Sequence, residues 1–576
     1  MPTESLGRIL FTFVVLSSPW FVLAQTPTLV PTPNDIEKRA GSVLSVIPGD
    51  ALVAVAFQDL QTLDARVAGL SKAFGEPLQP LRLAKFALGI AEGIDDRGSA
   101  AAVLVPVKGD GPVAEGLVLI LPTSNRNELL AFFDPMDMGG GVTRVTIRGR
   151  PSFAASRGGY TVFGSDLETV KSVASSGRPL VAQCSDHQLE LIAGHDVSVY
   201  VNVVALDRSA MGKRFAAWLG SHIGSAGLFE SMGSLLVAAR AESGGVFLSV
   251  LMEDRLQRHT ESRPATSETL LRGLPDEPFA VATGGLFSAD DHRVNTLTDA
   301  VVSAAVGLGI VRTEQADNVR AAYRVMVGRS AQVAASMSLL PGPEHGTIGA
   351  AKIITTRGKP ERLLRAIKSL VGLLKSDIFA DARYARVLER LEWRGGVEVR
   401  SGVEINHIVL PLDGLGDIDQ EKVAAAFGAE GVLVRLGAVD GKYVVVSLGG
   451  GVDRFDRIVG TLRAGRAPLS SDVALQMSRI AVSQERLWEA YVSVDRWLGI
   501  WSELLAIVGV RSQFAGMPQV NAPVAAAMHN VGKSATQIDL FIPVELLVAW
   551  KTAMSPVVAV PSVAEAAKAD AIVETP

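Results

Sequence analysis

The stretch LSVIPGDALVAVAF at residues 44–57 and the stretch LRGLPDEPFAVATGGL at residues 271–286 determine how the chain is organised. Each places an apolar residue, a proline and an acidic turn residue directly before a run of apolar residues. The runs Ala51–Phe57 and Phe279–Leu286 have the apolar content and the preceding turn that predict short strands. The two acidic residues, Asp50 and Glu277, are 227 positions apart (277 − 50), which predicts a long internal repeat.

Three further matches follow in the same order along the chain. Gly116–Phe133 resembles Gly349–Leu370, each an apolar strand, a polar break and a Leu-rich amphipathic helix; we expect Ser124 to cap the first helix and Pro360 to lie in the first turn of the second. The segments 157–163 and 440–446 each predict a hairpin turn, followed by a helix that begins near Asp166 or Asp453. Trp218–Gly220 matches Trp497–Gly499 at an offset of 279 (497 − 218).

These matches predict two related halves, residues 41–262 and residues 263–552. Because the offset grows from 227 to about 280, the second half is expected to carry an insertion near 376–430, with its own strand pair at Val397–Arg400 and Val403–Leu410.

Periodicity within each half indicates the fold class. One apolar stripe repeats at helical spacing in Leu60, Leu63, Val67 and Leu70, and another in Leu363, Leu364, Ile367, Leu370 and Leu374. Residues 143–148 alternate between apolar and polar, as in a strand with one wet face. We therefore expect an α+β protein of two related halves, whose mainly antiparallel, one-sided sheets are backed by helices.

The ends of the chain predict export. Residues 1–24 have a basic start, an apolar stretch and the ending Val22–Ala24, as in a cleavable signal peptide; residues 25–40 form a Pro/Thr-rich spacer and residues 553–576 a disordered tail. Gln25 stands where a lipid-anchored protein would have Cys. We expect an extracytoplasmic protein, periplasmic or secreted, that is soluble unless the signal is retained as an anchor.

Composition excludes several classes of function. A net charge of −5 with scattered basic residues argues against nucleic-acid binding. Cys184 is the one cysteine, so no intramolecular disulfide can form, and we expect it to be a buried small apolar residue rather than a redox or nucleophilic thiol.

Motifs for metals and cofactors are incomplete, so we expect neither a metal nor a cofactor. Cys184 and His187 lack the second ligand pair of a zinc site, and His187 is expected in a solvated loop. Asp413–Glu421 lacks the glycine of an EF-hand and favours a turn before a helix. The glycines at 139–141 and 449–451 and the sequence Gly532–Ser534 lack a complete phosphate-loop motif and predict turns.

Catalytic motifs are also incomplete, and we expect no catalytic residue. His195 and Asp196 suggest a relay with Ser198 or Ser209, but adjacent residues of a strand point to opposite sides. The pairs at 95–96 and 290–291 are more typical of solvated loops than of a glycosidase. Convergence of polar side chains such as Asp50, His195, Asp196 and Glu277 in one pocket would favour an enzyme, and their scatter over the surface would argue against one.

The segments Ile47–Ala51 and Leu274–Pro278 resemble those of large exported bacterial proteins, of planctomycete type, that belong to an uncharacterised family with a domain of unknown function. The resemblance implies export and supplies no site residues. The sequence hypothesis is a non-enzymatic binding or envelope-associated protein, with an unknown envelope or extracellular ligand in a surface or cleft between the two halves. Alternatives are a hydrolase with an unrecognised site in that cleft and a structural envelope component; a hydrophobic groove would favour lipid handling.

Overall fold

The computed structural model describes residues 43–75, 78–106, 116–209, 232–255, 265–287, 298–299, 302, 306, 311–341, 346–375, 388–411, 419–429, 431–507, 518–520, 522–532 and 534–554. The predicted signal peptide and spacer lie outside these residues, as do Trp218–Gly220 and Asp290–Asp291. The predicted tail lies outside them from residue 555 onward.

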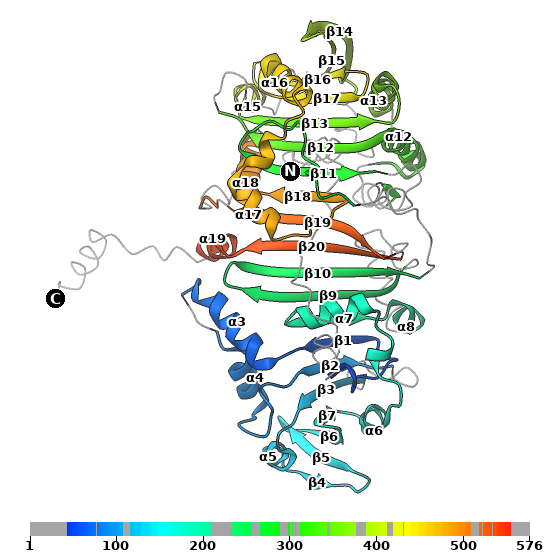
Figure 1. Ribbon diagram of the computed structural model, residues 1–576, viewed down its shortest axis with the longest axis vertical. Helices are drawn as coiled ribbons and strands as arrows, with labels where there is room; N and C mark the ends of the chain where they lie inside the picture. Colours follow the sequence, from blue (N-terminus) through cyan, green and yellow to red (C-terminus); the bar gives the residue numbers. More distant parts are fainter. Residues whose placement is uncertain are drawn as a thin grey trace, which may run out of the picture.

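A single antiparallel sheet of 20 strands runs along the longest axis of the molecule (Figure 1). Every described pairing between its strands is antiparallel, so the α+β class with antiparallel pairing is confirmed. The strands of the first region are β1 Val53–Phe57, β2 Ala100–Leu104, β3 Leu117–Pro122, β4 Met136–Asp137, β5 Val142–Ile147, β6 Arg150–Arg157, β7 Tyr160–Gly164, β8 Val197–Val201, β9 Met232–Glu242 and β10 Gly245–Asp254. Those of the second region are β11 Phe279–Leu286, β12 Ser330–Leu339, β13 Ile348–Thr356, β14 Glu392–Arg400, β15 Val403–Leu410, β16 Val432–Val439, β17 Tyr443–Leu448, β18 Trp488–Val492, β19 Val524–Val531 and β20 Ala535–Pro543.

Outward from the central pair β10–β20, the strands of the two regions follow one another in the same order, each strand of the first region matching the strand of the second region whose number is higher by ten. The full order is β4-β5-β6-β7-β3-β2-β1-β8-β9-β10-β20-β19-β18-β11-β12-β13-β17-β16-β15-β14. At the centre, Ser249 of β10 pairs with Asp539 of β20. Duplication of one ancestral half stays a prediction, which this shared order favours.

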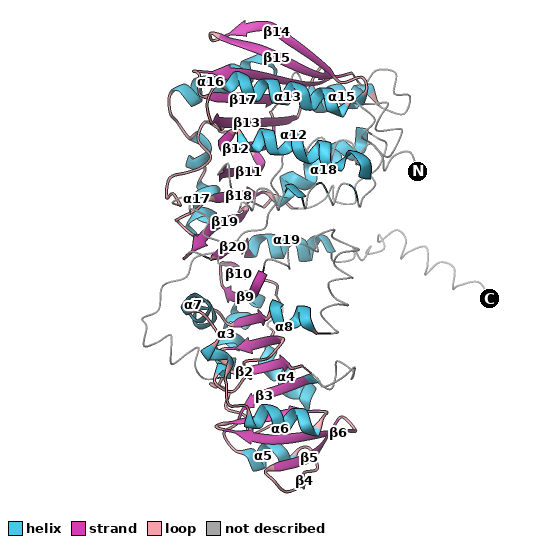
Figure 2. Cartoon of the chain, turned by 90° about the vertical axis from the view of Figure 1, so that its right-hand side faces the viewer, coloured by secondary structure: helices cyan, strands magenta, loops and turns pink. Residues whose placement is uncertain are grey.

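Helices lie on both sides of the sheet (Figure 2). In the first region they are α3 Leu60–Lys72, α4 Pro80–Leu88, α5 Arg126–Ala131, α6 Leu167–Ser175, α7 Asp186–Gly194 and α8 Val203–Arg208, with the 3₁₀ turn η2 Leu180–Ala182. In the second region they are α12 Ala316–Gly328, α13 Pro360–Leu374, α15 Gln420–Phe427, α16 Gly451–Arg463, α17 Val473–Ile480, α18 Val494–Ile507 and α19 Val544–Met554, with the 3₁₀ turns η3 Thr313–Gln315 and η5 Pro468–Ser471.

The expectation of one-sided sheets is wrong, because both faces are covered. Along β13, Ile348 and Ile354 enter a core beneath α12, α13 and α18, whereas Ala351 and Ile353 enter a core beneath α16 and α17. Successive side chains of a strand point to opposite faces, so one strand contributes to both cores. Small residues such as Ala351 fill the second face, and their weak hydrophobicity obscured it in the sequence pattern.

Two local expectations are corrected. The strand pair assigned to an insertion is present as β14 and β15, but these strands occupy the positions that β4 and β5 occupy in the first region. A clear addition is α15, which lies between β15 and β16, where β5 and β6 are joined by a short turn. Asn125, not Ser124, caps α5 by accepting hydrogen bonds from the amides of residues 127 and 128. Pro360 begins α13 as expected.

Candidate functional site

The four polar residues whose convergence would favour an enzyme do not meet in one pocket. Asp50 precedes β1 and Glu277 precedes β11, and six strands separate β1 from β11 in the sheet. Neighbouring strands are about 4.8 Å apart, so these carboxylates are on the order of 30 Å from each other. They cannot act on one bond.

Three of the four residues, Glu277, Asp196 and His195, make contacts within the fold. Glu277 accepts hydrogen bonds from the buried Arg454 guanidinium, at 2.7 Å from Nη2 and 3.0 Å from Nε. Asp196 accepts from Arg66 Nη1 at 2.6 Å and from the amide of Ala241 at 3.0 Å. His195 Nδ1 lies 2.7 Å from the carbonyl oxygen of residue 191, and burial lowers the pKa of His195 to about 4. These contacts hold strands and helices together.

Cys184 and His187 do not form a metal site. Cys184 packs against the core beneath α6 and α7, and burial raises the pKa of its thiol to about 12, so the interpretation as a small apolar residue is favoured. His187 is in the first turn of α7, not in a loop as expected, because Ser185 and Gln188 form a capping box that starts the helix there. Among the described residues, no group of three or more His, Cys, Asp or Glu side chains is placed to hold a metal ion.

The remaining motifs are local structure. Residues 139–141 join β4 to β5, residues 449–451 join β17 to α16, and all six glycines have positive φ. A Cβ at Gly449 would lie 2.2 Å from the carbonyl oxygen of Ile348, so only glycine fits there. Asp419 caps α15, whereas residues 412–418 lie outside the described residues. Asp96 pairs with Lys85 at 2.6 Å.

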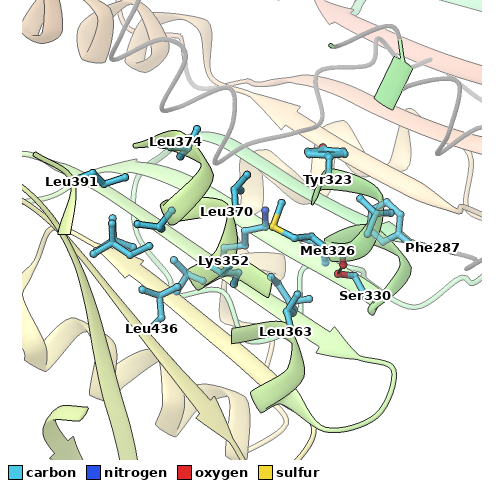
Figure 3. Close-up of a pocket in the computed structure, with 18 residues that line it drawn as sticks. Phe287, Tyr323, Met326, Ser330, Lys352, Leu363, Leu370, Leu374, Leu391 and Leu436 are labelled. Carbon is cyan, nitrogen blue, oxygen red and sulfur yellow. Dashed lines mark hydrogen bonds between the residues drawn. The ribbon is translucent and has the colours of Figure 1, made fainter. Parts of the chain in front are cut away.

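The candidate site is a cavity in the second region, between α12, α13 and the sheet (Figure 3). Its volume is about 170 Å³, and it is partly open. The residues that line it are mostly aliphatic or aromatic: Phe287, Tyr323, Met326, Val327, Ser330, Val333, Lys352, Ile354, Leu363, Ile367, Leu370, Val371, Leu374, Leu391, Ile408, Val434, Leu436 and Val446. An apolar cavity of roughly 150 Å³ is large enough for benzene, so this one has room for a small organic molecule.

The sequence explains one wall of the cavity. The stripe predicted on residues 363–374 faces the sheet, as expected: Leu363 is buried and Ile367 and Leu370 are half-buried against the cavity. The floor comes from β13, β16 and β17, whose side chains on this face are mainly Val, Leu and Ile. Branched side chains are typical of strands, and here they pack in the same core as Leu363 and Val371 of α13.

Three polar side chains interrupt the apolar lining. Lys352 is the one charged residue among those that line the cavity, and burial lowers its pKa to about 8. Figure 3 shows its side chain pointing from β13 toward the helices, between Leu370 and Met326. The buried Tyr323 hydroxyl has no hydrogen-bond partner among the described residues, and Ser330 Oγ donates to the carbonyl oxygen of Met326 at 3.0 Å.

Sequence reasoning missed Lys352, although the register of the sheet identifies it. Lys352 pairs with Val446 of β17, and at the matching place of the first region Leu119 of β3 pairs with Phe163 of β7. The match of residues 157–163 with residues 440–446 places Phe163 opposite Val446 in the alignment. A charged residue therefore stands where the first region has the half-buried Leu119, and the same alignment extended back to β3 and β13 pairs the two residues.

Comparisons with known proteins give no family. No family model and no curated protein matches the chain. Among solved structures, crystal form IV of TP0453 is 9% identical, covers 51% of this chain and 98% of its own length, and has a TM-score of 0.22. Crystal form I of TP0453 is 9% identical and has a TM-score of 0.22; the match covers 36% of this chain and 77% of the TP0453 chain. Likeness at this level assigns neither fold nor function.

Proposed function

We propose that this chain is an extracytoplasmic binding protein that holds a small apolar molecule in the cavity between α12 and α13. The observation that carries the proposal is the cavity itself, with a lining that is almost entirely aliphatic and aromatic. Ligand sites are typically apolar recesses with a few placed polar groups, and Lys352, Tyr323 and Ser330 are such groups. The signal-like sequence of residues 1–24 supports export.

This proposal differs from the sequence hypothesis in where the ligand lies. We expected a cleft between two halves, but β10 and β20 pair from Gly245 to Glu253 at that boundary and continue the sheet across it. The cavity lies wholly within the second region. The alternative of a hydrolase in a cleft between the halves is not supported, because Asp50, His195, Asp196 and Glu277 do not converge. The alternative of a structural envelope component gives no reason for a cavity.

The proposal is tested by isothermal titration calorimetry of the purified protein with 1-octanol. Binding should be saturable with one site and with a negative heat-capacity change, because apolar surface is removed from water. The Ile367→Trp variant should lose this binding, since the indole ring would occupy the cavity that Ile367 now lines.

The matched control is Lys368→Trp, which adds the same ring to the adjacent, exposed residue of α13. It should bind 1-octanol like the unmodified protein. If the unmodified protein does not bind 1-octanol, or if Ile367→Trp binds it unchanged, the cavity is not a ligand site.

The described part of the chain contains no helix long and apolar enough to cross a membrane.

A further inference from the structure

The two outer edges of the sheet differ in length. At the end of the first region the edge strand is β4, which has 2 residues, whereas β14 at the end of the second region has 9 (Figure 1). β14 pairs with β15 along one side, and no strand in the described part of the chain pairs with its other side. A long open edge presents backbone amide and carbonyl groups to which a strand of another chain can bond.

The side chains of β14 separate into an apolar face and a charged face. Trp393 and Val399 share one face, where Trp393 packs against the core and Val399 is 69% exposed. The other face carries the charged side chains of the strand: Glu392, Arg394, Glu398 and Arg400. Between the two ends of the strand lie Gly395 and Gly396, where the register against β15 shifts.

The order of charges along β14 is complementary to itself. In an antiparallel pair of two copies with a two-fold axis at Gly396, each residue faces the one that lies equally far from Gly396 on the other side. Glu392 then faces Arg400 of the second copy, and Arg394 faces Glu398. The two-fold axis makes each of these pairs occur twice, and opposite charges directly across from each other stabilise paired strands.

The uncharged residues fit the same register. Val399 faces Trp393 of the second copy, and Val397, which is 48% exposed, faces Gly395. The register shift within β14 falls at the axis, so the two copies pair through two equal segments, residues 392–394 of one copy with residues 398–400 of the other. Glycine at the axis has no side chain, which lets the two backbones approach each other.

We infer that β14 is the interface of a two-fold dimer, in which β14 of one copy pairs antiparallel with β14 of a second copy. The sheet then continues across the axis as it does at its own centre, where the matching strands β10 and β20 pair from Gly245 to Glu253. Dimerisation goes beyond the binding function proposed above and does not require it.

The second copy adds to charge pairs that one copy already has. Within β14, Arg394 Nη2 lies 2.7 Å from Glu392 Oε2, and Arg400 Nε lies 3.8 Å from Glu398 Oε2. Each of these charges gains a further partner of opposite sign across the axis. Because each copy contributes a strand of only 9 residues, fewer than the roughly 20–30 of a stable interface, the dimer should be weak.

Sedimentation velocity of the purified protein at about 1 to 200 μM tests the inference, since a weak dimer dissociates within such a range. The unmodified protein should convert from monomer to dimer as its concentration rises. Glu392→Arg places a positive charge opposite Arg400 at both ends of the interface. This variant should weaken the dimer by about ten-fold or more, because like charges directly across from each other destabilise paired strands.

The charge exchange is the decisive variant. Glu392→Arg combined with Arg400→Glu restores opposite charges in this register, so the double variant should dimerise within about three-fold of the unmodified protein. Both side chains are exposed, so neither substitution disturbs the core. The control Lys368→Glu reverses a charge on the exposed side of α13 and should leave dimerisation unchanged.

Three results would overturn the inference. The first is a protein that stays monomeric throughout the concentration range. The second is a dimer that Glu392→Arg leaves unchanged, because the interface then lies elsewhere. The third is a dimer that Glu392→Arg weakens and the double variant does not restore, because Glu392 and Arg400 then do not face each other.

Discussion

The two regions of the sheet share one strand order but are filled differently. In the first region, Phe163 belongs to an apolar core with Phe133, whose ring lies edge-on to Phe163 at 5.9 Å, and the partly buried Leu119 packs against that core. At the matching positions of the second region, Lys352 and Val446 line the cavity. The helix that follows the strand is α5, with 6 residues, in one region and α13, with 15 residues, in the other. At matching places the sheet therefore carries an aromatic core in the first region and a lysine-containing cavity in the second.

A second difference concerns a buried polar cluster on the opposite face. Tyr200 of β8 pairs with Ala54, and Tyr491 of β18 pairs with Ala282, so the two tyrosines occupy matching places. Ser198 and Glu489 each stand two residues before their tyrosine, so they are matching residues of the two regions. His195 and Arg486 each stand five residues before it and match in the same way. The second region thus has a buried ion pair where the first has a neutral histidine and a serine. Electrostatic stability should differ accordingly between the two regions.

The largest expected effect comes from breaking this ion pair. Glu489 is inaccessible to solvent; it accepts from Arg486 Nη1 at 2.7 Å, from the Tyr491 hydroxyl at 3.0 Å and from the amide of Leu270 at 2.5 Å. Glu489→Leu leaves the Arg486 guanidinium buried without its partner, which should cost about 3–5 kcal/mol of unfolding free energy. Urea denaturation followed by circular dichroism measures the loss.

The matched control is Ser198→Ala in the first region. The Ser198 hydroxyl is buried with no hydrogen-bond partner among the described residues, so its removal breaks no hydrogen bond and should not lower stability. Similar losses in the two variants would show that the ion pair does not distinguish the two regions.

The second effect depends on pH and belongs to His195. Burial lowers its pKa from 6.5 to about 4, so the folded state resists protonation more than the unfolded state does. Below about pH 4 the histidine is protonated in both states and the cost of the buried charge is fully present; stability is regained as pH rises from 4 to 6.5. Over that range the unfolding free energy should rise by about 3 kcal/mol, because a tenfold change in proton concentration is worth about 1.4 kcal/mol.

His195→Asn removes this titration and keeps a donor for the carbonyl oxygen of Leu191. Stability measured by urea denaturation at pH 4.5 and pH 7.5 should therefore vary less in the variant than in the unmodified protein. His529, whose pKa is also lowered to about 4, titrates in both proteins and cancels in the comparison. Equal pH dependence in the two proteins would mean that His195 is not buried in its neutral form.

The sequence predicted much of the fold, because its signals are local. The prolines and acidic residues before β1 and β11, the stripe on α13 and the hairpin turns at 157–160 and 440–443 each act over a few residues. Periodicity of this kind depends only on which side chains face one core. The strand order, by contrast, depends on pairs such as Ser249 with Asp539, which are 290 positions apart (539 − 249). No local pattern contains that information.

The candidate site was harder to predict, because a cavity is a property of volumes rather than of motifs. Histidine clusters, carboxylate pairs and glycine loops are visible in a sequence, whereas this site consists of Leu, Ile and Val with one lysine. Such residues are typical of any core, and only the distance between α13 and the sheet leaves space among them. The signal that was missed is Lys352, which stands where the repeat has Leu119 in the first region.

The smallest expected effects come from giving each region the residue that the other has at the matching position, Phe163 in the first region and Val446 in the second. Phe163→Val in the first region removes most of a ring packed against Phe133 and should cost about 2 kcal/mol, since the surrounding core collapses only in part. Val446→Phe in the second region places the same ring where space exists and should change stability by less than about 1 kcal/mol, whereas overpacking a filled core costs about 1–3 kcal/mol. Thermal denaturation of both variants gives the comparison. If Val446→Phe destabilises the protein as much as Phe163→Val does, the second region is as tightly filled as the first, and the contrast between the two regions fails along with the space that the ligand requires.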